Sequence, residues 1–186
     1  MAAYPKTLSG KTVATYVNTH TDLSDELYRE GTLVSDNYKN ILRSQTNAAA
    51  IPAEVTVRYG VTVRRANLRN LPTGEGLFFY ASDRNFDALQ ETALDPGEAV
   101  AILHTSTNGY FYYVQAYNYR GWLSKFDVAE TDRCTWLRYA EPKNFLTVVA
   151  KDYTLKADGA QVLFQQGARL QLADKKASAY TVKVPV

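Results

Sequence analysis

Hydrophobic and polar residues alternate with a period of two through the middle of the chain, which predicts β-strands rather than helices. The alternation begins after Glu54, and its apolar members are Val55, Val57, Tyr59, Val61 and Val63. The run Ala99–Leu103 is apolar throughout and follows the turn sequence Asp95-Pro96-Gly97, so it predicts a compact buried strand. These runs indicate a mainly β core.

A tyrosine-rich stretch, Gly109–Leu123, is the best-defined part of this pattern. It follows Asn108, and Asn-Gly supplies the positive φ angles of a tight hairpin turn. Aromatic and β-branched residues come next without a helical period, and a turn at Tyr117-Asn118 leads into the short strand Arg120–Leu123. Gly121 lets another backbone pass close to that strand. Three residues of the first strand share a face and are expected mostly in the core: Tyr110, Tyr112 and Val114.

The first fifty residues have a different pattern. Ser24–Glu30 has a capping serine, early acids and a following glycine, which predicts a short helix. Ser35–Arg43 carries an apolar stripe and predicts a second one. Ala48–Pro52 is expected to be a linker. Two such helices bury too little surface to fold alone, so we expect this segment to lie against another part of the protein.

Residues 74–95 form a long excursion between predicted strands, in which acids outnumber bases. Its acids are Glu75, Asp83, Asp87, Glu91 and Asp95, with Arg84 as the opposing base. The segment from Asp83 to Ala93 is expected to hold one or two helical turns, with Phe86 and Leu89 pointing inward. Phe78–Tyr80 would form an apolar patch on the loop. The alternative is a self-packed loop with its aromatic rings tucked beneath it.

A weaker copy of the same pattern follows a predicted linker, Cys134–Asn144. Phe145–Val149 predicts a strand, Gln166–Leu172 matches the earlier run from Pro96 to Ile102, and Tyr180–Val184 stands where Tyr112–Val114 stood. The copy lacks a counterpart of Arg120–Leu123, so we expect a truncated second barrel and a chain that is a fragment.

Composition and charge exclude some classes of function. The chain has 186 residues and a formal net charge of +2, too small to indicate nucleic-acid binding. The basic residues Arg58, Arg64, Arg65 and Arg69 are offset by the acidic excursion. No apolar run is long enough to span a membrane, and the first residues lack the apolar segment of a signal peptide. Only one cysteine, Cys134, is present, so no internal disulfide forms.

The residues Asn67–Thr73, Asn-Leu-Arg-Asn-Leu-Pro-Thr, resemble the Leu-Asn-Val-Arg-Ser-Gly-Pro-Ser signature of bacterial SH3-like (SH3b) domains. The spacing continues through Gly97, Asn108-Gly109 and Gly121-Trp122. Further segments look like the first SH3b domain of NlpC-type cell-wall peptidases: 58–60, 65–69, 71–73, 83–87, 90–92 and 119–122. Members of that group carry an N-terminal stabilising segment, two SH3b domains and a papain-like cysteine peptidase that cuts peptidoglycan stem peptides.

The resemblance implies a mainly β fold made of an SH3-like barrel and a second, truncated SH3-like barrel, preceded by a short helical N-terminal arm. Residues 1–51 would be the stabilising segment. Residues 52–130 would be the SH3b barrel with a long inserted loop. Residues 131–186 would be the incomplete second SH3b-like barrel.

No catalytic residue is expected in this chain. The peptidase of that group needs a thiolate with a histidine base, and no histidine follows Cys134; His20 and His104 lie upstream. Cys134 is interpreted as a small, half-buried linker residue. Asp83, Asp87 and Glu91 lack the spacing of a metal site and are expected to be solvated loop acids, so neither a metal nor another cofactor is expected.

Five residues are candidates for ligand binding or domain docking: Phe78, Tyr80, Asp83, Asp87 and Phe111. The first four lie on the excursion, which we expect to face the peptidase. Phe111 matches the groove aromatic of eukaryotic SH3 domains. Asp127 stands where those domains carry a tyrosine, so recognition of proline-rich peptides loses one of its aromatic rings.

The resemblance implies that the chain is the non-catalytic portion of a peptidoglycan hydrolase of the NlpC cysteine-peptidase type, acting in targeting, stabilisation and substrate selection. Its expected partners are an NlpC-type peptidase domain in the same full-length chain and a peptidoglycan stem peptide, without nucleic acid or a membrane span. The resemblance places it in the bacterial cell envelope, in the periplasm or associated with the outer membrane. The alternative is a free-standing SH3-like module that binds a protein or a glycan.

Overall fold

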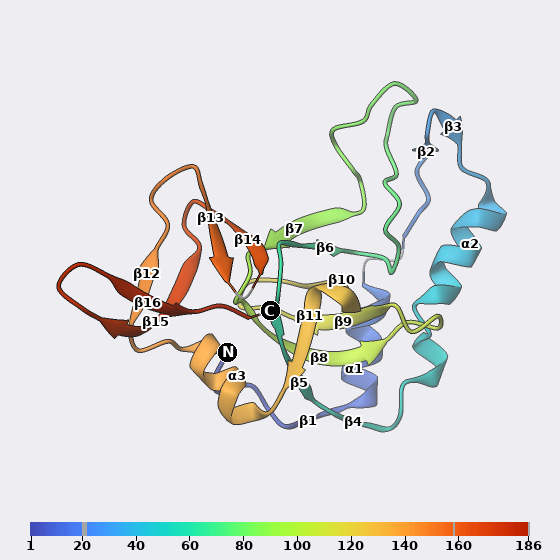
Figure 1. Ribbon diagram of the computed structural model, residues 1–186. Coiled ribbons are helices and arrows are strands. Elements are labelled where there is room, and N and C mark those ends of the chain that lie inside the picture. The colour runs from blue at the N-terminus through green and yellow to red at the C-terminus, as the bar shows by residue number, and fades with distance from the viewer. Residues whose placement is uncertain (20–21, 158, 186) are drawn as a thin grey trace.

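The computed structural model describes residues 1–19, 22–157 and 159–185 (Figure 1). The helical elements are α1 (Gly10–Asn18), α2 (Asp36–Gln45), α3 (Arg133–Ala140) and the 3₁₀ turns η1 (Ala48–Ala50) and η2 (Lys125–Asp127). The strands of the N-terminal and central parts are β1 (Thr7–Ser9), β2 (Tyr28–Arg29), β3 (Thr32–Leu33), β4 (Glu54–Thr56), β5 (Arg58–Thr62), β6 (Ala66–Arg69), β7 (Gln90–Leu94), β8 (Ala99–Thr105), β9 (Phe111–Gln115), β10 (Arg120–Ser124) and β11 (Val128–Thr131). The C-terminal strands are β12 (Phe145–Thr147), β13 (Asp152–Ala157), β14 (Ala160–Gln165), β15 (Arg169–Lys175) and β16 (Tyr180–Lys183).

Seven antiparallel strands form the central sheet in the order β11-β5-β8-β9-β10-β6-β7. The predicted strands of the Gly109–Leu123 hairpin are confirmed as β9 and β10. Gly121 is required for a close approach, because a Cβ there would lie 2.6 Å from the carbonyl oxygen of Arg69 on β6. The prediction of a closed barrel is wrong, since β11 and β7 remain the two edges of the sheet.

The apolar residues on both faces of the sheet are buried, although the sheet does not close into a barrel. Alternate residues of β8 enter different cores: Val100 and Ile102 point to one face, and Ala99, Ala101 and Leu103 point to the other. The first core lies among the sheet strands themselves. The second lies beneath α1, α3 and the β1–β4 pair, which is why β8 is apolar at every position from Ala99 to Leu103.

The residues that are buried on and beside the tyrosine-rich strand β9 are only partly those predicted. Val114 is fully buried, as predicted, but Tyr110 is 53% exposed, so its prediction as a core residue is wrong. Tyr110 precedes β9 at the hairpin turn, and its ring lies 5.9 Å from the exposed ring of Phe126. Tyr113, on the opposite face, is buried against Trp122 with ring centroids 5.2 Å apart.

The hydropathy pattern does not predict helix α1, although the helix is well defined in the structure. The side chain of Ser9 accepts a hydrogen bond from the amide of Thr12, which caps the helix, and Val13 and Val17 are buried on the sheet. The sequence Thr-Val-Ala-Thr-Tyr-Val has a low helix propensity because its β-branched residues lose rotamer freedom in a helix. Packing on the sheet therefore determines this helix. It confirms that the N-terminal segment lies against another part of the protein.

Of the two helices predicted in this segment, one is confirmed. Helix α2 begins after Ser35, whose side chain accepts from the amide of Tyr38. The helix predicted over Ser24–Glu30 is wrong: this segment leads into the β2–β3 hairpin, whose turn residues Glu30 and Gly31 have φ angles of 51° and 86°. Gly31 thus serves a hairpin turn instead of ending a helix.

The segment interpreted as a linker after Cys134 is largely helix α3, so that prediction is wrong. The side chain of Asp132 caps the helix by accepting from the amides of Cys134 and Thr135. Trp136 is fully buried and donates from Nε1 to the carbonyl of Val100 at 3.0 Å. One large side chain anchors the helix to the central sheet, and the hydropathy pattern of a short polar helix does not reveal this.

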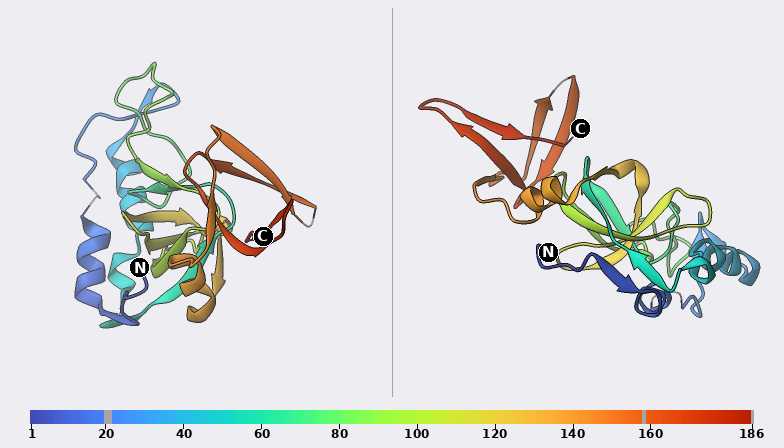
Figure 2. Two further views of the ribbon diagram at one scale, coloured as in Figure 1. Left: turned by 90° about the vertical axis from the view of Figure 1, so that its left-hand side faces the viewer. Right: turned by 90° about the horizontal axis from the view of Figure 1, so that it is seen from below.

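The C-terminal unit comprises a three-stranded sheet, β12-β15-β16, and the separate hairpin β13-β14. They enclose a small core that includes Phe164 and Leu170. A second truncated barrel is not confirmed, since the strands form two separate sheets. This unit projects from the central sheet on the side of α3 (Figure 2). None of the helices in the described parts of the chain is long and apolar enough to cross a membrane.

Candidate docking surface on the inserted loop

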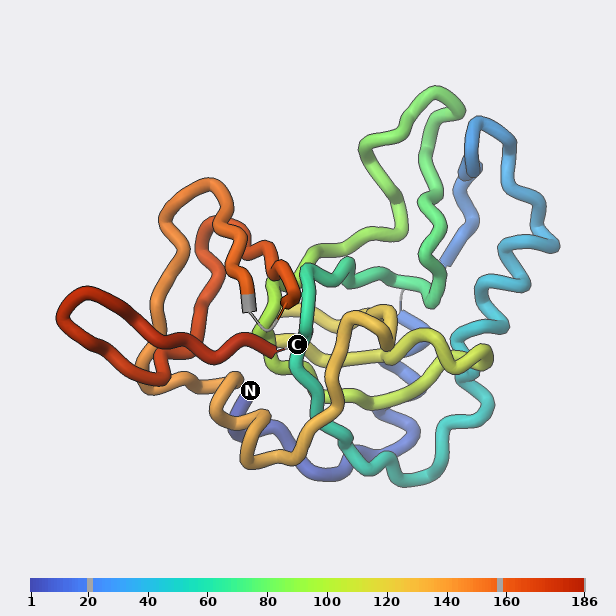
Figure 3. Tube along the Cα trace, viewed as in Figure 1, coloured from blue at the N-terminus to red at the C-terminus, as the bar shows by residue number. Residues whose placement is uncertain are grey.

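The predicted excursion is a loop between β6 and β7 that rises from the end of the sheet beside the β2–β3 hairpin (Figure 3). The helical turns predicted within 83–93 are absent. Residues 83–89 form loop and turn structure, and residues 90–94 form β7. Leu89 is buried, as expected, whereas Phe86 is 77% exposed, so its predicted inward orientation is wrong. The loop therefore has a packed lower part, the stalk (residues 75–78 and 87–89), and an exposed tip, residues 79–86.

A buried ion pair fixes the base of the stalk. Arg69 Nη1 lies 2.7 Å from Asp87 Oδ2, and only 6% of the arginine side chain is exposed. The other carboxylate oxygen of Asp87 accepts from the amides of Leu77 and Leu89, at 3.1 and 3.0 Å. Arg69 also donates to the carbonyl of Glu75 at 2.6 Å. Both ends of the loop are thereby tied to β6, and Asp87 has its oxygens engaged within the protein.

The N-terminal arm supports the other side of the stalk. Phe78 and Tyr28 exchange backbone hydrogen bonds of 2.8 and 2.9 Å, so the loop adds a bridge to the β2–β3 hairpin. Beneath this bridge lies a core shared by the arm and the loop: Leu23, Leu27, Val34, Leu42, Leu71, Leu77 and Leu89. The stalk is a packed part of the fold, held by residues distant in sequence.

A polar cluster joins the arm and the stalk at the surface. Glu75 accepts a short hydrogen bond from the hydroxyl of Tyr38 and pairs with Arg29 at 2.9 Å. The guanidinium of Arg29 also lies 4.9 Å from the centre of the Tyr38 ring. The hydrogen bond from Tyr38 lowers the pKa of Glu75, with a further contribution from Arg29.

The tip presents aromatic rings to solvent. Phe79, Tyr80 and Phe86 are 50%, 71% and 77% exposed, so the rings are not tucked beneath the loop. Asp83 organises the tip by accepting from the amides of Asn85 and Phe86, at 2.8 and 3.3 Å. These backbone hydrogen bonds lower the pKa of Asp83, which is therefore ionised at neutral pH.

Most of the acids in the excursion are engaged with partners. Glu75 pairs with Arg29, Asp87 with Arg69 and Asp95 with Arg65, while Glu91 accepts from the hydroxyl of Tyr119. Asp83 differs from them because its hydrogen bonds come from backbone amides of its own turn. The carboxylate of Asp83 therefore remains for a ligand, beside the positive charge of Arg84 in the same tip.

Phe111, the remaining candidate residue, lies on β9 and not in the loop. It is half-buried and packs at the margin of the core beneath α1 and α3. Close to it, the exposed rings of Tyr110 and Phe126 have centroids 5.9 Å apart, and Lys125 lies 5.5 Å from each ring centre. Four of the five candidate residues therefore lie together in the inserted loop: Phe78, Tyr80, Asp83 and Asp87. Phe111 lies apart from them, on strand β9 of the central sheet.

The four arginines of the basic run all pair with acids. Arg58 pairs with Glu130, and Arg64 pairs with Asp127 at 3.3 Å. Arg65 and Arg69 pair with Asp95 and Asp87. These contacts neutralise the run locally, and the described residues contain no group of three or more His, Cys, Asp or Glu side chains that could hold a metal ion.

Cys134 is exposed in the first turn of α3, and the interpretation of a half-buried linker residue is wrong. The guanidinium of Arg138 lies 3.8 Å from its sulfur. His104 lies on β8, where its Nε2 contacts the carbonyl of Asn47 at 3.0 Å, and burial lowers its pKa. His20 lies outside the described residues.

The chain folds as a mainly β protein, built on an antiparallel sheet with an inserted loop. Residues 77–124 match the family described as SH3 domain (SH3b1 type), so the chain contains an SH3b domain in this region. The match begins within the stalk and ends with β10, and it includes the whole tip.

One solved structure shares the fold over most of the chain. It was described as a novel NlpC/P60 endopeptidase from Photobacterium damselae subsp. piscicida, and it superposes with a TM-score of 0.70 at 17% sequence identity. The match covers 94% of this chain and 42% of that one, so the chain spans less than half the length of the endopeptidase. No curated protein sequence matches the chain.

Proposed function

We propose that this chain is the non-catalytic SH3b portion of a bacterial peptidoglycan hydrolase, and that the tip of the inserted loop docks on an NlpC-type peptidase domain of the same polypeptide. The observation that carries the proposal is the contrast within the loop. A stalk fixed by the buried Arg69–Asp87 pair holds three exposed aromatic rings at a defined position. Aromatic residues are enriched at interfaces because they bury a large area with few rotatable bonds.

The comparisons support this proposal in two ways. The SH3b1-type match includes the tip, and the fold is shared with an NlpC/P60 endopeptidase that is longer than this chain. A docked tip would form one wall of the peptidase cleft. Asp83 would then attract the free ammonium group of a peptidoglycan stem peptide, and burial beside a second domain would strengthen that attraction. The protein would act in the bacterial cell envelope, where this substrate is found.

The first experiment sequences the gene beyond codon 186. A downstream peptidase with an Asp-Cys-Ser nucleophile and a later histidine is expected. The second produces that domain separately and measures its association with the 186-residue chain by calorimetry. Replacing the tip rings by serine (Phe79→Ser, Tyr80→Ser, Phe86→Ser) should abolish the association, whereas unchanged affinity would overturn the docking role.

A free-standing glycan-binding module is the alternative, and one observation favours it. Tyr110 and Phe126 are 53% and 60% exposed and lie side by side, an arrangement on which a sugar ring could stack. The variant Tyr110→Ser with Phe126→Ser is therefore the matched control for the tip variant. Loss of binding to purified peptidoglycan in this control, with tip variants unaffected, would support the alternative. A stop codon after residue 186 would point the same way.

A further inference from the structure

A cleft of about 220 Å³ lies where the C-terminal unit meets the central sheet, well away from the inserted loop. Its walls come from the start of β8, the end of α3 and strand β15. The polar and aromatic side chains that line it are Glu98, Tyr117, Tyr139, Arg169 and Gln171. Ligand sites occur preferentially at such junctions between structural units.

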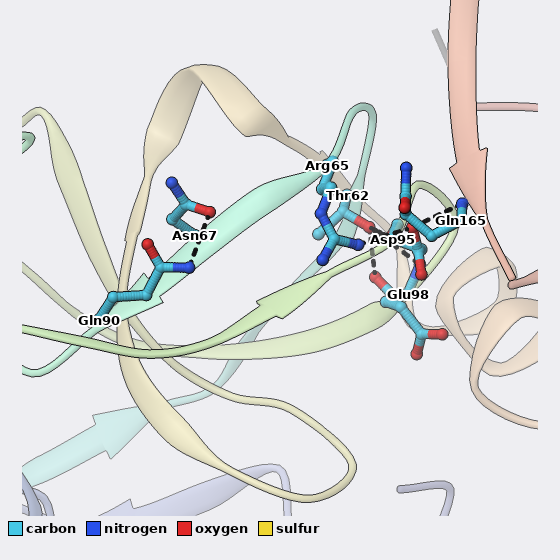
Figure 4. A network of polar contacts seen from close by, with 7 residues as sticks. All are labelled: Thr62, Arg65, Asn67, Gln90, Asp95, Glu98 and Gln165. Carbon is cyan, nitrogen blue, oxygen red and sulfur yellow. Dashed lines mark hydrogen bonds and ion pairs between the residues drawn. The ribbon is translucent and has the colours of Figure 1, made fainter. Parts of the chain in front are cut away.

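A network of hydrogen bonds beside the cleft holds the two units together (Figure 4). Asp95 accepts from the backbone amide of Gln165 in the C-terminal unit at 3.2 Å and pairs with Arg65 at 3.1 Å. The hydroxyl of Thr62 donates to the carbonyl of Asp95 at 2.6 Å and accepts from the amide of Glu98 at 2.9 Å. The backbone of Glu98 is thus fixed, while Figure 4 shows its carboxylate pointing away from the network.

The charged groups of the cleft are not engaged with each other. In the described parts of the chain, neither Glu98 nor Arg169 forms an ion pair within 4.0 Å, although the guanidinium of Arg169 lies 5.0 Å from the ring centre of Phe145. Burial raises the pKa of Glu98, and the positive charge of Arg169 opposes this rise. The two groups therefore sense each other across the cleft without contact.

A third polar group lacks a partner. The side-chain amide of Gln171 donates from Nε2 to the carbonyl of Arg138 at 3.3 Å, which fixes its orientation. Its Oε1 is buried and has no hydrogen-bond partner among the described residues. A buried acceptor without a partner costs about 1–3 kcal/mol, and because this oxygen has almost no solvent-accessible surface, the contacts with a ligand in the cleft fall to Glu98 and Arg169.

We infer that this cleft binds a small zwitterion, a free amino acid or a dipeptide, with its ammonium group at Glu98 and its carboxylate at Arg169. The chemistry of the walls matches both ends of such a molecule. A carboxylate accepts from an ammonium group, and a guanidinium donates two parallel hydrogen bonds to a carboxylate. The phenol rings of Tyr117 and Tyr139 would flank the middle of the ligand.

The size of the cleft supports this class of ligand. Sites for drug-sized molecules occupy about 300–1,000 Å³, so a cleft of about 220 Å³ takes a smaller molecule. A ligand bound in this way would bridge the central sheet and the C-terminal unit. This site is independent of the proposed docking role, since it shares no residue with the loop.

Alanyl-alanine is the probe for the test, because its ends can be blocked one at a time. Binding to the 186-residue chain is measured by calorimetry for alanyl-alanine, N-acetyl-alanyl-alanine and alanyl-alanine amide. Each blocked peptide is expected to bind about tenfold more weakly than the free dipeptide, since each has lost one charged hydrogen-bonding group. Chemical shift changes at Gly97 and Gly167 would place the peptide in the cleft.

Two variants assign each end of the ligand. Glu98→Gln should remove the preference for the free over the acetylated peptide, and Arg169→Gln should remove the preference for the free acid over the amide. Glu54→Gln and Arg84→Gln, which change exposed residues on β4 and in the loop tip, away from the cleft lining, are the matched controls and should bind as the parent does. Absence of alanyl-alanine binding, equal binding of the three peptides, or retention of both preferences in the two variants would each overturn the inference.

Discussion

The guanidinium of Arg69 lies 2.7 Å from the carboxylate of Asp87, and this pair joins the last residue of β6 to the far end of the inserted loop. The loop between the two groups also contacts the N-terminal arm, through Phe78 and Glu75. Only 6% of the arginine side chain and 16% of the aspartate side chain are exposed. Loss of either partner would leave a nearly buried charge without its counterion.

Asp87→Ala is therefore expected to lower the free energy of unfolding by about 3–5 kcal/mol, as for other buried pairs that lose one partner. Urea unfolding measures this change. Glu130→Ala is the matched control, because the Arg58–Glu130 pair is about half exposed and such pairs contribute about 0–1 kcal/mol. Equal losses in the two variants would show that the Arg69–Asp87 pair does not fix the loop.

Trp122→Ala should unfold the central sheet or bring it close to unfolding. Trp122 is fully buried, and its ring packs edge-on against Tyr113 in the core beneath α1 and α3. Removing such a side chain costs about 3–5 kcal/mol, against about 5–15 kcal/mol for the stability of a whole domain. Thermal melting followed by circular dichroism gives the readout, with Trp122→Phe as the milder control. An unchanged melting temperature would contradict this role of the tryptophan.

The sheet was largely predictable from the sequence, because hydrophobic and polar residues alternate with a period of two along its strands and turn residues mark where the strands end. Gly121 has the predicted close approach to another backbone, and Gly109 has the predicted positive φ angle, 72°, whereas Asn108 does not have one. The helices were harder to predict for a physical reason. α1 is rich in β-branched residues, and α3 is a short polar helix anchored chiefly by the buried Trp136, so packing on the sheet determines both.

The candidate site was predictable only in part. The composition of the loop identified an exposed apolar patch, and Phe79 and Tyr80 do lie at the surface. Composition does not show which acids find partners. Asp87 pairs with Arg69, which lies on the strand before the loop, and Phe78 pairs with Tyr28, which lies in the arm. Such contacts between distant residues carry no local pattern in the sequence.

The polar cluster of Glu75, Tyr38 and Arg29 should make stability depend on pH. The pKa of Glu75 in the folded protein lies below its ordinary value of 4.5, chiefly because Tyr38 donates a hydrogen bond to the carboxylate. A lowered pKa stabilises the fold above the unfolded-state pKa, and this contribution is lost as the pH falls through the folded-state pKa. Urea midpoints of the parent and Glu75→Gln should therefore differ near neutral pH and converge as the pH falls below 4.5. A difference that stays constant down to the lowest pH would contradict the argument, and Glu54→Gln is the exposed control.

The chain alone is expected to hydrolyse no peptidoglycan peptide. Cys134 is exposed, and its neighbour at 3.8 Å is the guanidinium of Arg138, which is not a general base. Incubation with muropeptides and mass spectrometry of the products tests this. Turnover that disappears in Cys134→Ala would contradict the prediction and assign a catalytic role to this thiol.

The last prediction separates the two parts of the inserted loop. Leu77 is fully buried in the core shared with the arm, so Leu77→Ala should destabilise the protein by about 2–5 kcal/mol. Tyr80 and Phe86 are 71% and 77% exposed, and replacing both by serine should change the free energy of unfolding by less than about 0.5 kcal/mol for each substitution. Urea unfolding of the two variants provides the comparison.

The same pair of tip substitutions should impair a full-length enzyme that contains the peptidase. Because the stalk stays folded, the loss would appear as reduced cleavage of stem peptides with a free amino terminus relative to intact peptidoglycan. Asp83→Asn would test the charge separately, since it keeps the shape of the turn and removes the group that attracts the ammonium. If both variants cleave the two substrates in the parent ratio, the tip has no part in selection. If the tip variant loses stability as Leu77→Ala does, the rings belong to the core and the division of the loop into stalk and tip is wrong.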